Sequence, residues 1–177
     1  MSESIVVREL ERARWQGRTL TFDYTTDGYF DFDVHDKNFA MVYKPFAEAR
    51  HKSFTDTLFA DWPEAPTAYG AFRGSGDLAG VIEGSIEGWN NRFRISNLLV
   101  LEGARGHGVG ELLMARMLDR ARETGARMAV PETQSCNVRA IGFYERCGFS
   151  VIGFDLFAYS NNDVEKGEVR VEMGRRL

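Results

Sequence analysis

The chain has 177 residues, 44% of them hydrophobic, and a net charge of −4. This is enough apolar material for one compact core without metals or crosslinks, so we expect a single domain over residues 1–177. The sequence has no apolar run of about 18 residues, no signal-peptide pattern in residues 1–10 and no basic cluster. We therefore expect a cytoplasmic protein that neither spans a membrane nor binds nucleic acid.

The N-terminal third is predicted to begin with a short strand over Ile5–Leu10. Alternating apolar and polar residues indicate two further strands, Thr19–Tyr24 and Tyr29–Val34, joined by the hairpin signal Thr25–Gly28. The segment Phe39–Ala60 is predicted to be a helix that is interrupted near its proline.

Three strands are predicted in the middle of the chain, at Ala68–Arg73, Leu78–Glu87 and Arg92–Leu101. Two turns rich in glycine, asparagine and aspartate, Gly74–Asp77 and Gly88–Asn91, connect them. Connections of four residues favour hairpins, so these strands are expected to form an antiparallel meander.

The third of these strands runs into Arg105-Gly106-His107-Gly108-Val109-Gly110 and then into a helix. Glycines let the main chain approach a ligand closely, and the first N–H groups of a helix attract an anion. The turn continues with Glu111-Leu112, so it is neither a P-loop nor a dinucleotide fingerprint. It predicts a diphosphate-binding loop, and the alternative is an ordinary tight strand-to-helix turn.

The helix after this loop carries one apolar stripe, Leu113, Met114, Met117, Leu118 and Ala121, and ends before Gly125. A strand at Arg127–Val130, a helix at Asn137–Cys147 and a strand at Phe149–Phe157 are predicted next. The resulting order of strand, helix, strand, helix and strand is typical of α/β folds.

The Arg-x-x-Gly-x-Gly loop and this order of elements resemble the GNAT acyltransferase superfamily. The resemblance implies a GNAT-like acyl-CoA N-acyltransferase fold, an α/β fold with a mixed sheet whose antiparallel meander runs into the strand–helix series. It also implies acetyl-CoA as acyl donor, with pantetheine pairing to the main chain of the strand before the loop. The implied cofactor-binding residues are Leu99, Val100, Leu101, Arg105, Gly106, His107, Gly108, Val109 and Gly110. His107 is expected to face solvent.

The second predicted helix adds Asn137 and Tyr144, which lie two turns apart and so share a face. The block Asn137–Phe149 fits the same family pattern. The resemblance implies that Asn137 contacts the cofactor and that Tyr144 is a catalytic acid that protonates the departing thiolate. The alternative for Tyr144 is a core aromatic beside Phe143.

The C-terminal half also resembles one branch of the superfamily, the streptothricin acetyltransferases, in Pro131–Gln134, Asn137–Phe149, Gly153–Asp155 and Tyr159–Asn161. That branch acetylates an amine of a strongly basic antibiotic, and the resemblance places Glu132 at the acceptor site. Relatives in the branch carry two adjacent acids on the strand before the loop, where this chain has Ser96-Asn97.

The catalytic base is therefore sought elsewhere, first at Glu132 and then at Glu83 and Glu87, each of which has a solvated surface position as the alternative. Asp31 and Asp33 lie among aromatic residues and are candidates for binding a cationic acceptor, together with Glu83. The alternative for the two aspartates is the polar side of a half-buried hairpin.

The function predicted from the sequence is acetylation of a small-molecule primary amine. The alternatives are a peptide, protein or polyamine acceptor, or a non-catalytic sensor that binds acyl-CoA. Cys136 and Cys147, at opposite ends of one helix, are expected to stay unbridged thiols, and no metal site is expected. The chain is expected to be a monomer or a homodimer, in which Glu168–Arg175 could pair across a sheet edge.

Overall fold

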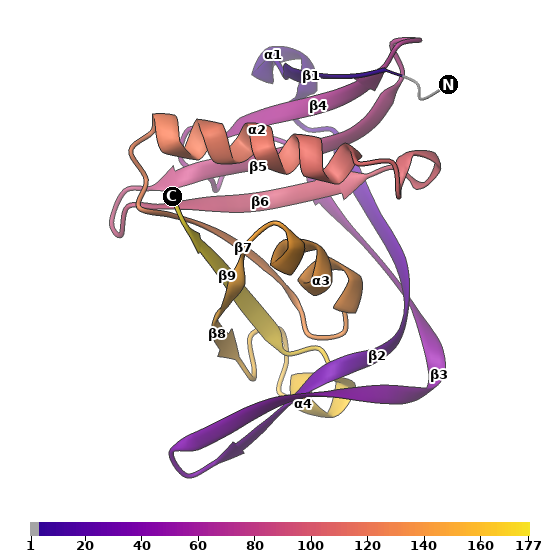
Figure 1. Cartoon of the computed structure of the whole chain (residues 1–177), viewed down its shortest axis with the longest axis vertical. Coiled ribbons are helices and arrows are strands. Elements are labelled where there is room, and N and C mark those ends of the chain that lie inside the picture. Colours follow the sequence, from indigo (N-terminus) through magenta and orange to yellow (C-terminus); the bar gives the residue numbers. More distant parts are fainter. Residues whose placement is uncertain (1–3) are drawn as a thin grey trace. The chain divides into compact units, whose positions relative to one another are not determined.

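The computed structural model describes residues 4–177, so the first three residues of the segment considered for a signal peptide lie outside it. The chain is divided into two compact units (Figure 1). The first unit contains the described residues up to Phe22, Thr55–Val130 and Arg176–Leu177, and the second contains Asp23–Phe54 and Pro131–Arg175. No helix of the described chain is long and apolar enough to cross a membrane.

The first unit is built on an antiparallel sheet whose strands follow the order β1, β4, β5, β6. The bounds of these strands are β1 Ile5–Glu9, β4 Thr67–Arg73, β5 Leu78–Glu87 and β6 Arg92–Val100. β4, β5 and β6 follow one another in sequence and in the sheet, so the predicted meander is confirmed to within one residue at each end.

Helix α2 (Val109–Glu123) lies along this sheet (Figure 1). Its predicted apolar stripe is buried, and Glu111, Asp119, Arg122 and Glu123 on the other side are exposed. Gly125 ends the helix with a φ of 74°, a conformation that glycine adopts without strain. A short 3-10 turn, η1 (Glu102–Ala104), separates β6 from the loop that precedes α2.

A hydrophobic cluster stabilises the same unit. It joins the small helix α1 (Arg12–Trp15) and the segment after β3 to the sheet. Its buried members are Leu10, Leu20, Leu58, Phe59, Ala68, Val81 and Leu99. Trp15 and Phe72 pack against the cluster with their rings edge to face, 6.2 Å apart.

The second unit contains most of the C-terminal elements. β7 (Met128–Gln134) begins in the first unit and continues into the second. The other elements are α3 Val138–Arg146, β8 Ser150–Asp155, α4 Asp163–Lys166 and β9 Arg170–Arg176. β9 has β7 as one neighbour and antiparallel β8 as the other. The prediction that this terminal strand offers a free edge for dimer pairing is therefore wrong, because both of its sides are paired.

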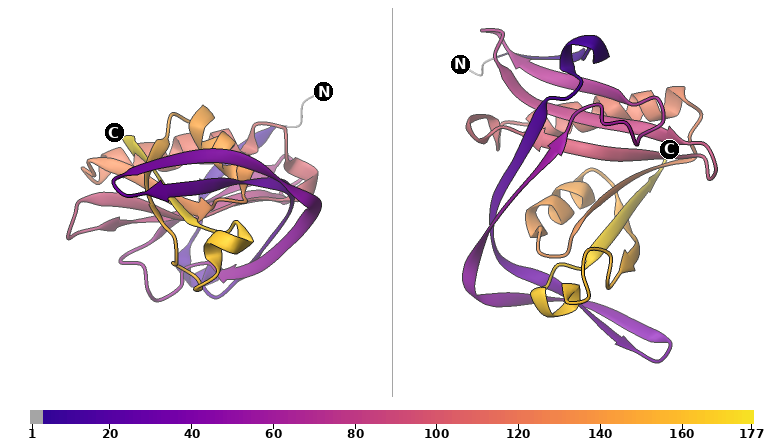
Figure 2. Two further views of the ribbon diagram at one scale, coloured as in Figure 1. Left: turned by 90° about the horizontal axis from the view of Figure 1, so that it is seen from below. Right: turned by 180° about the vertical axis from the view of Figure 1, so that it is seen from behind.

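The N-terminal ribbon differs most from the prediction. The residues predicted to form a hairpin and then a helix instead form two long paired strands, β2 (Thr19–His35) and β3 (Asn38–Thr57), with the turn at Asp36-Lys37 (Figure 2). Aromatic pairs between the strands explain why, since Tyr29 stacks on Phe46 with ring centroids 4.8 Å apart. Among the described strands β3 pairs with β2 alone, and proline is tolerated in a strand of this kind because one edge is open.

Gly28 lies inside β2 and not in the turn that the sequence predicts. A Cβ atom at this position would come within 2.6 Å of the Lys44 carbonyl oxygen on β3. The glycine is required by the close approach of two strands, and sequence alone does not separate that role from a turn.

Candidate active site

The loop between β6 and α2 has the geometry expected of an anion-binding turn. Gly106 and Gly108 have φ values of 77° and 78°, which side chains rarely allow, and Gly108 is the residue before the first turn of α2. No residue in the range 4–177 accepts a hydrogen bond from the main-chain N–H groups of Gly106, His107, Gly108, Val109 or Gly110. Five successive donors at a helix N-terminus are thus available to a diphosphate.

The end of β6 is partly different from the prediction. The Leu101 N–H donates to the Ala79 carbonyl at 2.9 Å, so it is already paired and is not available to pantetheine. Successive residues of an antiparallel strand point to opposite sides, so the Val100 N–H points away from β5. Val100 is the predicted strand residue whose main chain best fits that role.

Arg105 and His107 stiffen the loop. Arg105 Nε donates to the Val100 carbonyl oxygen at 3.0 Å, which closes the loop onto the strand before it. His107 Nδ1 lies 2.8 Å from the Arg105 carbonyl oxygen, and the imidazole is exposed, as expected.

A β-bulge interrupts β6 in the middle of the first unit. Glu83 of β5 is opposite Asn97 and Gly84 is opposite Ile95, so Ser96 is the extra residue. The Glu83 carboxylate accepts hydrogen bonds from Asn97 Nδ2 at 2.9 Å and Ser96 Oγ at 3.2 Å. Its other oxygen accepts from the Phe59 main-chain N–H at 2.6 Å, and Phe59 itself has a φ of 53°.

This arrangement corrects the interpretation of Glu83. The side chain is 1% exposed, so the solvated surface alternative is wrong. The two residues that stand where relatives are expected to carry acids serve as donors to an acid on the neighbouring strand. Glu83 holds the bulge and the Phe59 segment together, and its burial keeps the carboxylate out of reach of solvent.

Glu87, the last candidate base on β5, is engaged in a different way. Its carboxylate accepts a hydrogen bond from Arg94 Nε at 2.6 Å and another from Asn90. Burial by itself would raise the pKa of Glu87, but these hydrogen bonds and the nearby arginine charges outweigh burial and hold it below its usual value.

In the second unit, α3 begins and ends as the sequence predicts. Asn137 is the N-cap, and its Oδ1 accepts a hydrogen bond from the Ala140 N–H at 3.3 Å. Gly148, with a φ of 82°, ends the helix. The cap uses only the carbonyl oxygen of the Asn137 side chain, so its NH₂ group is not committed to the helix.

Tyr144 lies on α3 between two aromatic rings. Its ring contacts Phe143 at 5.6 Å and Phe149 at 5.9 Å, both edge to face, and the residue is 7% exposed. None of residues 4–177 forms a hydrogen bond with its hydroxyl. Burial, followed by the proximity of Cys147 and Glu132, raises the pKa of Tyr144 well above its usual value. The core-aromatic and proton-donor interpretations are therefore compatible, because the ring is packed and the hydroxyl stays protonated.

Glu132 lies on β7 at the centre of a polar cluster in the second unit. Its carboxylate forms an ion pair with Arg170 at 2.9 Å and accepts a hydrogen bond from the Tyr159 hydroxyl at 3.2 Å. Arg170 also contacts Glu172 at 2.8 Å. Burial and then the Glu132 charge raise the pKa of Tyr159, so this phenol stays neutral. Tyr159 and Arg170 have no sequence signal of their own beyond the branch resemblance of Tyr159–Asn161.

The predicted acceptor-binding aspartates on the ribbon already have partners. Asp31 forms an ion pair with Lys44, and Asp33 Oδ1 lies 2.7 Å from His35 Nε2. Exposed pairs of this kind are weak, because water and salt screen the two charges. A cationic acceptor would have to compete with Lys44 and His35, so this position for acceptor binding remains a prediction.

The two cysteines are unbridged, as expected. Cys136 is buried and contacts the Tyr24 hydroxyl at 3.7 Å. Within residues 4–177, no group of three or more histidines, cysteines or acids is arranged to hold a metal ion.

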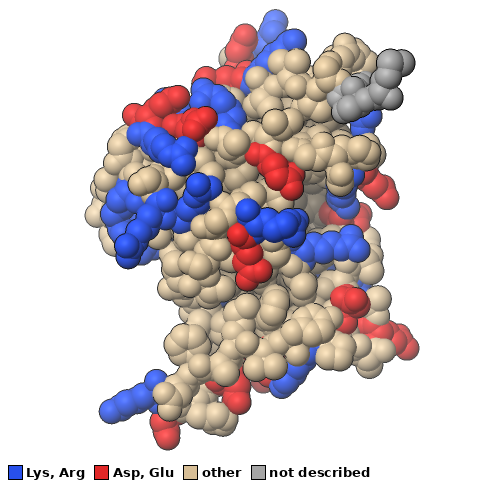
Figure 3. Space-filling view, viewed as in Figure 1, with Lys and Arg blue, Asp and Glu red and all other residues tan. Residues whose placement is uncertain are grey.

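Charges of both signs are mixed on the surface. Figure 3 shows, on the face that it draws, Lys and Arg side chains interspersed with Asp and Glu.

A meander that leads into a donor-rich glycine loop and a packed helix, and then into a further strand, is typical of the acyl-CoA N-acyltransferase class of α/β protein. The comparison with family models agrees, because the Acetyltransferase (GNAT) family matches residues 34–149. The chain belongs to this family.

Two relatives extend over most of the chain. A streptothricin acetyltransferase of Streptomyces lavendulae is 33% identical over 153 residues, which cover 82% of this chain and 81% of the relative. A streptothricin acetyltransferase of Escherichia coli is 35% identical over 133 residues, which cover 72% of each chain.

Solved structures have the same fold. The crystal structure of nourseothricin acetyltransferase matches with a TM-score of 0.73 and 28% identity, over 97% of this chain and 98% of that one. A Bacillus anthracis protein solved with acetyl coenzyme A matches with a TM-score of 0.79 and 24% identity, over 98% and 99% of the two chains. The predicted fold class is confirmed over nearly the whole length of the chain.

Proposed function

We propose that this acetyltransferase transfers the acetyl group of acetyl-CoA to a primary amine of a cationic antibiotic of the streptothricin class. The observation that carries the proposal is the identity of 33% to a streptothricin acetyltransferase over 82% of the chain. The free main-chain donors of Gly106–Gly110 supply the matching cofactor site. The thiols of Cys136 and Cys147 fit a reducing compartment, and the cytoplasm remains the expected location.

The cofactor would be held by the first unit's loop and strand. Gly106–Gly110 would donate main-chain hydrogen bonds to its diphosphate, and the Val100 main chain would pair with the pantetheine arm. When bound, acetyl-CoA supplies an activated thioester carbonyl. The Asn137 side-chain NH₂, which the helix cap leaves uncommitted, is the proposed additional donor.

The acceptor amine must lose a proton before it attacks. An alkylamine has a pKa of about 10.4, so deprotonation near pH 7 costs on the order of 4–5 kcal/mol. Glu132 is the proposed base, directly or through a water molecule. Its hydrogen bond with Tyr159 and its ion pair with Arg170 orient the carboxylate.

The remaining proton is supplied by Tyr144. The amine nitrogen forms a bond to the acetyl carbon, the carbon–sulfur bond breaks, and the sulfur receives the phenolic proton. The second proton, which the nitrogen loses as it becomes an amide, returns to the Tyr144 phenolate directly or through water. A thiol has a pKa of about 8.5 and leaves readily, so the acid completes the transfer rather than driving it. The raised pKa of Tyr144 keeps that proton available at every ordinary pH.

A thiol-release assay with acetyl-CoA tests the proposal. Purified protein is offered streptothricin or nourseothricin, and the product is examined by mass spectrometry for the addition of one acetyl group. Polyamines, aminoglycosides and peptide N-termini serve as the comparison acceptors. Release of thiol with an aminoglycoside or a peptide alone would overturn the choice of acceptor.

The second candidate is a sensor that binds acyl-CoA without turning it over. It is favoured by one observation, namely that Ser96 and Asn97 support Glu83 and supply no acid on β6. Calorimetric binding of acetyl-CoA, together with no thiol release for any acceptor in the panel, would favour the sensor over the enzyme.

A further inference from the structure

A pocket of about 300 Å³ lies in the first unit at the end of the β5–β6 hairpin, outside the residues that the proposed reaction uses. One wall is the segment Trp62–Glu64, and the other is formed by the last residues of β5, the turn after it and Arg94 of β6. Pro63 is buried and anchors the segment that carries Trp62.

Two tryptophans border this pocket with their rings in solvent. Trp62 is 63% exposed and Trp89 is 88% exposed, although large aromatic residues are normally buried. The remaining tryptophan, Trp15, packs against the hydrophobic cluster. The faces of exposed indole rings attract cations, and tryptophan does so most strongly among the aromatic residues.

The charges of the pocket favour the same ligand. Glu87 is neutralised by Arg94, with Nε and Oε1 2.6 Å apart. Glu64, in contrast, forms no ion pair or hydrogen bond with any of residues 4–177. One uncompensated carboxylate beside two indole rings is complementary to an organic ammonium or guanidinium group.

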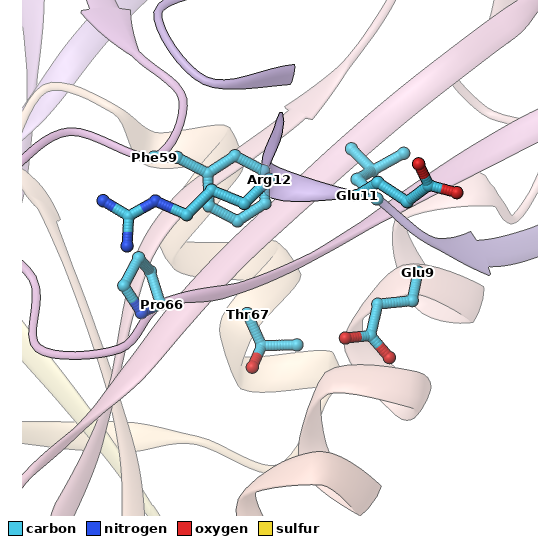
Figure 4. A pocket seen from close by; sticks show the side chains of 7 residues that line it. Glu9, Glu11, Arg12, Phe59, Pro66 and Thr67 are labelled. Atoms are coloured by element: carbon cyan, nitrogen blue, oxygen red, sulfur yellow. The ribbon is translucent and has the colours of Figure 1, made fainter. Parts of the chain in front are cut away.

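Another hollow of this unit, about 270 Å³ at the end of β1, has no exposed aromatic ring (Figure 4). Its aromatic residue, Phe59, is 2% exposed. Its arginine, Arg12, pairs with Asp61 at 3.9 Å. Of these two pockets, only the Trp62–Trp89 pocket combines exposed aromatic rings with an unpaired acid.

The pocket also lies close to the bulge along the same two strands. Arg94 precedes Ser96 by two residues, and Ser85 follows Glu83 by two residues. Residues two apart on a strand share a face and are separated by about 7 Å. Glu83 and Ser85 on that face are 1% and 4% exposed, so the face is closed at the bulge and a ligand of the pocket is confined to the hairpin end.

We propose that the Trp62–Trp89 pocket binds an ammonium group of a polycationic ligand such as the proposed acceptor. The inference rests on the proposed function only in taking the acceptor to be cationic. It assigns a cation-binding site to this hairpin, apart from the residues of the proposed reaction.

The test measures binding without acetyl-CoA, using isothermal calorimetry with tri-lysine amide as the polycation and butylamine as the single cation. The variants are Trp89→Leu and Glu64→Gln. The matched controls are Phe157→Leu, an exposed aromatic in the second unit, and Asp77→Asn, an exposed acid at the other end of β5. Because Trp89 and Glu64 are exposed, these variants are expected to fold.

We expect tri-lysine amide to bind the wild type more tightly than butylamine does. Each pocket variant should weaken it by about three- to tenfold, while the controls leave it unchanged. Absence of tri-lysine binding, or equal affinity in the wild type and both pocket variants, would overturn the proposal. The proposed function fails separately, if no acceptor releases thiol while the pocket variants still weaken tri-lysine binding.

Discussion

The two units of this protein hold a carboxylate in opposite ways. In the first unit, Glu83 is buried and accepts hydrogen bonds from three neutral donors, with no cation among them. In the second unit, Glu132 is only partly buried and forms an ion pair with Arg170, as well as a hydrogen bond with Tyr159.

In the proposed function, Glu83 has a structural role and Glu132 a chemical one. Removing the Glu83 carboxylate would leave its buried donors without an acceptor. An unsatisfied buried donor costs more free energy than the net contribution of the hydrogen bond it has lost. Glu132 is only partly buried, and its partner Arg170 has a second carboxylate, Glu172, within contact.

The largest effect is expected for Glu132→Gln. If Glu132 is the base, kcat should fall by about 10³-fold, within the range that general base catalysis supplies. The matched control is Glu172→Gln, which removes the other carboxylate on Arg170 and leaves Glu132 in place. Equal kcat for the wild type and Glu132→Gln would move the base elsewhere.

A smaller fall in kcat, about 10²-fold, is expected for Tyr144→Phe, because the leaving thiol needs less help than the amine. The affinity for acetyl-CoA, measured by calorimetry, should not change. The raised pKa of Tyr144 means that its hydroxyl remains protonated beyond its usual value of 10.0. A wild-type pH profile of kcat should therefore show no loss from Tyr144 below that pH, and a tyrosine-dependent fall near pH 8 would contradict its role.

Glu83→Ala should act on stability. Leaving the Asn97 amide and the Phe59 N–H without an acceptor should lower the free energy of unfolding by about 2–3 kcal/mol, measured by urea titration. Glu83→Gln, which keeps one acceptor oxygen, should lose less. If Glu83→Gln has normal stability but a kcat reduced a hundredfold, Glu83 has a chemical role and not a structural one.

The smallest effect is expected for Gly108→Ala, whose left-handed φ of 78° disfavours a side chain. A side chain at this φ costs about 1–2 kcal/mol, so we expect the variant's loop to leave this conformation in the free protein. Binding of acetyl-CoA must then restore the strained conformation, and the affinity should fall by roughly tenfold. Gly125→Ala imposes the same strain at the other end of α2, at a φ of 74°. That control should lower the melting temperature and leave cofactor affinity unchanged. If both variants bind acetyl-CoA as the wild type does, the loop is not the cofactor site.

Much of the first unit follows from local sequence. Three features are each signalled by residues that lie close together in the sequence. They are the meander, the apolar stripe of α2 and the glycines of Gly106–Gly110. The same holds for α3, whose start at Asn137 and end at Gly148 are capping signals. Short-range rules therefore predicted the loop and the helix that carry the candidate site.

The sequence by itself determined the family resemblance, the glycine loop after β6 and the position of Tyr144 on its helix, because each depends on neighbours along the chain. Only the tertiary structure decided that Phe39–Thr57 forms a strand, since aromatic partners on β2 outweigh local preference. It also decided that Glu83 is buried and that Glu132 meets Arg170, 38 positions away. Such pairings depend on which strands become neighbours, and no local spacing records that choice.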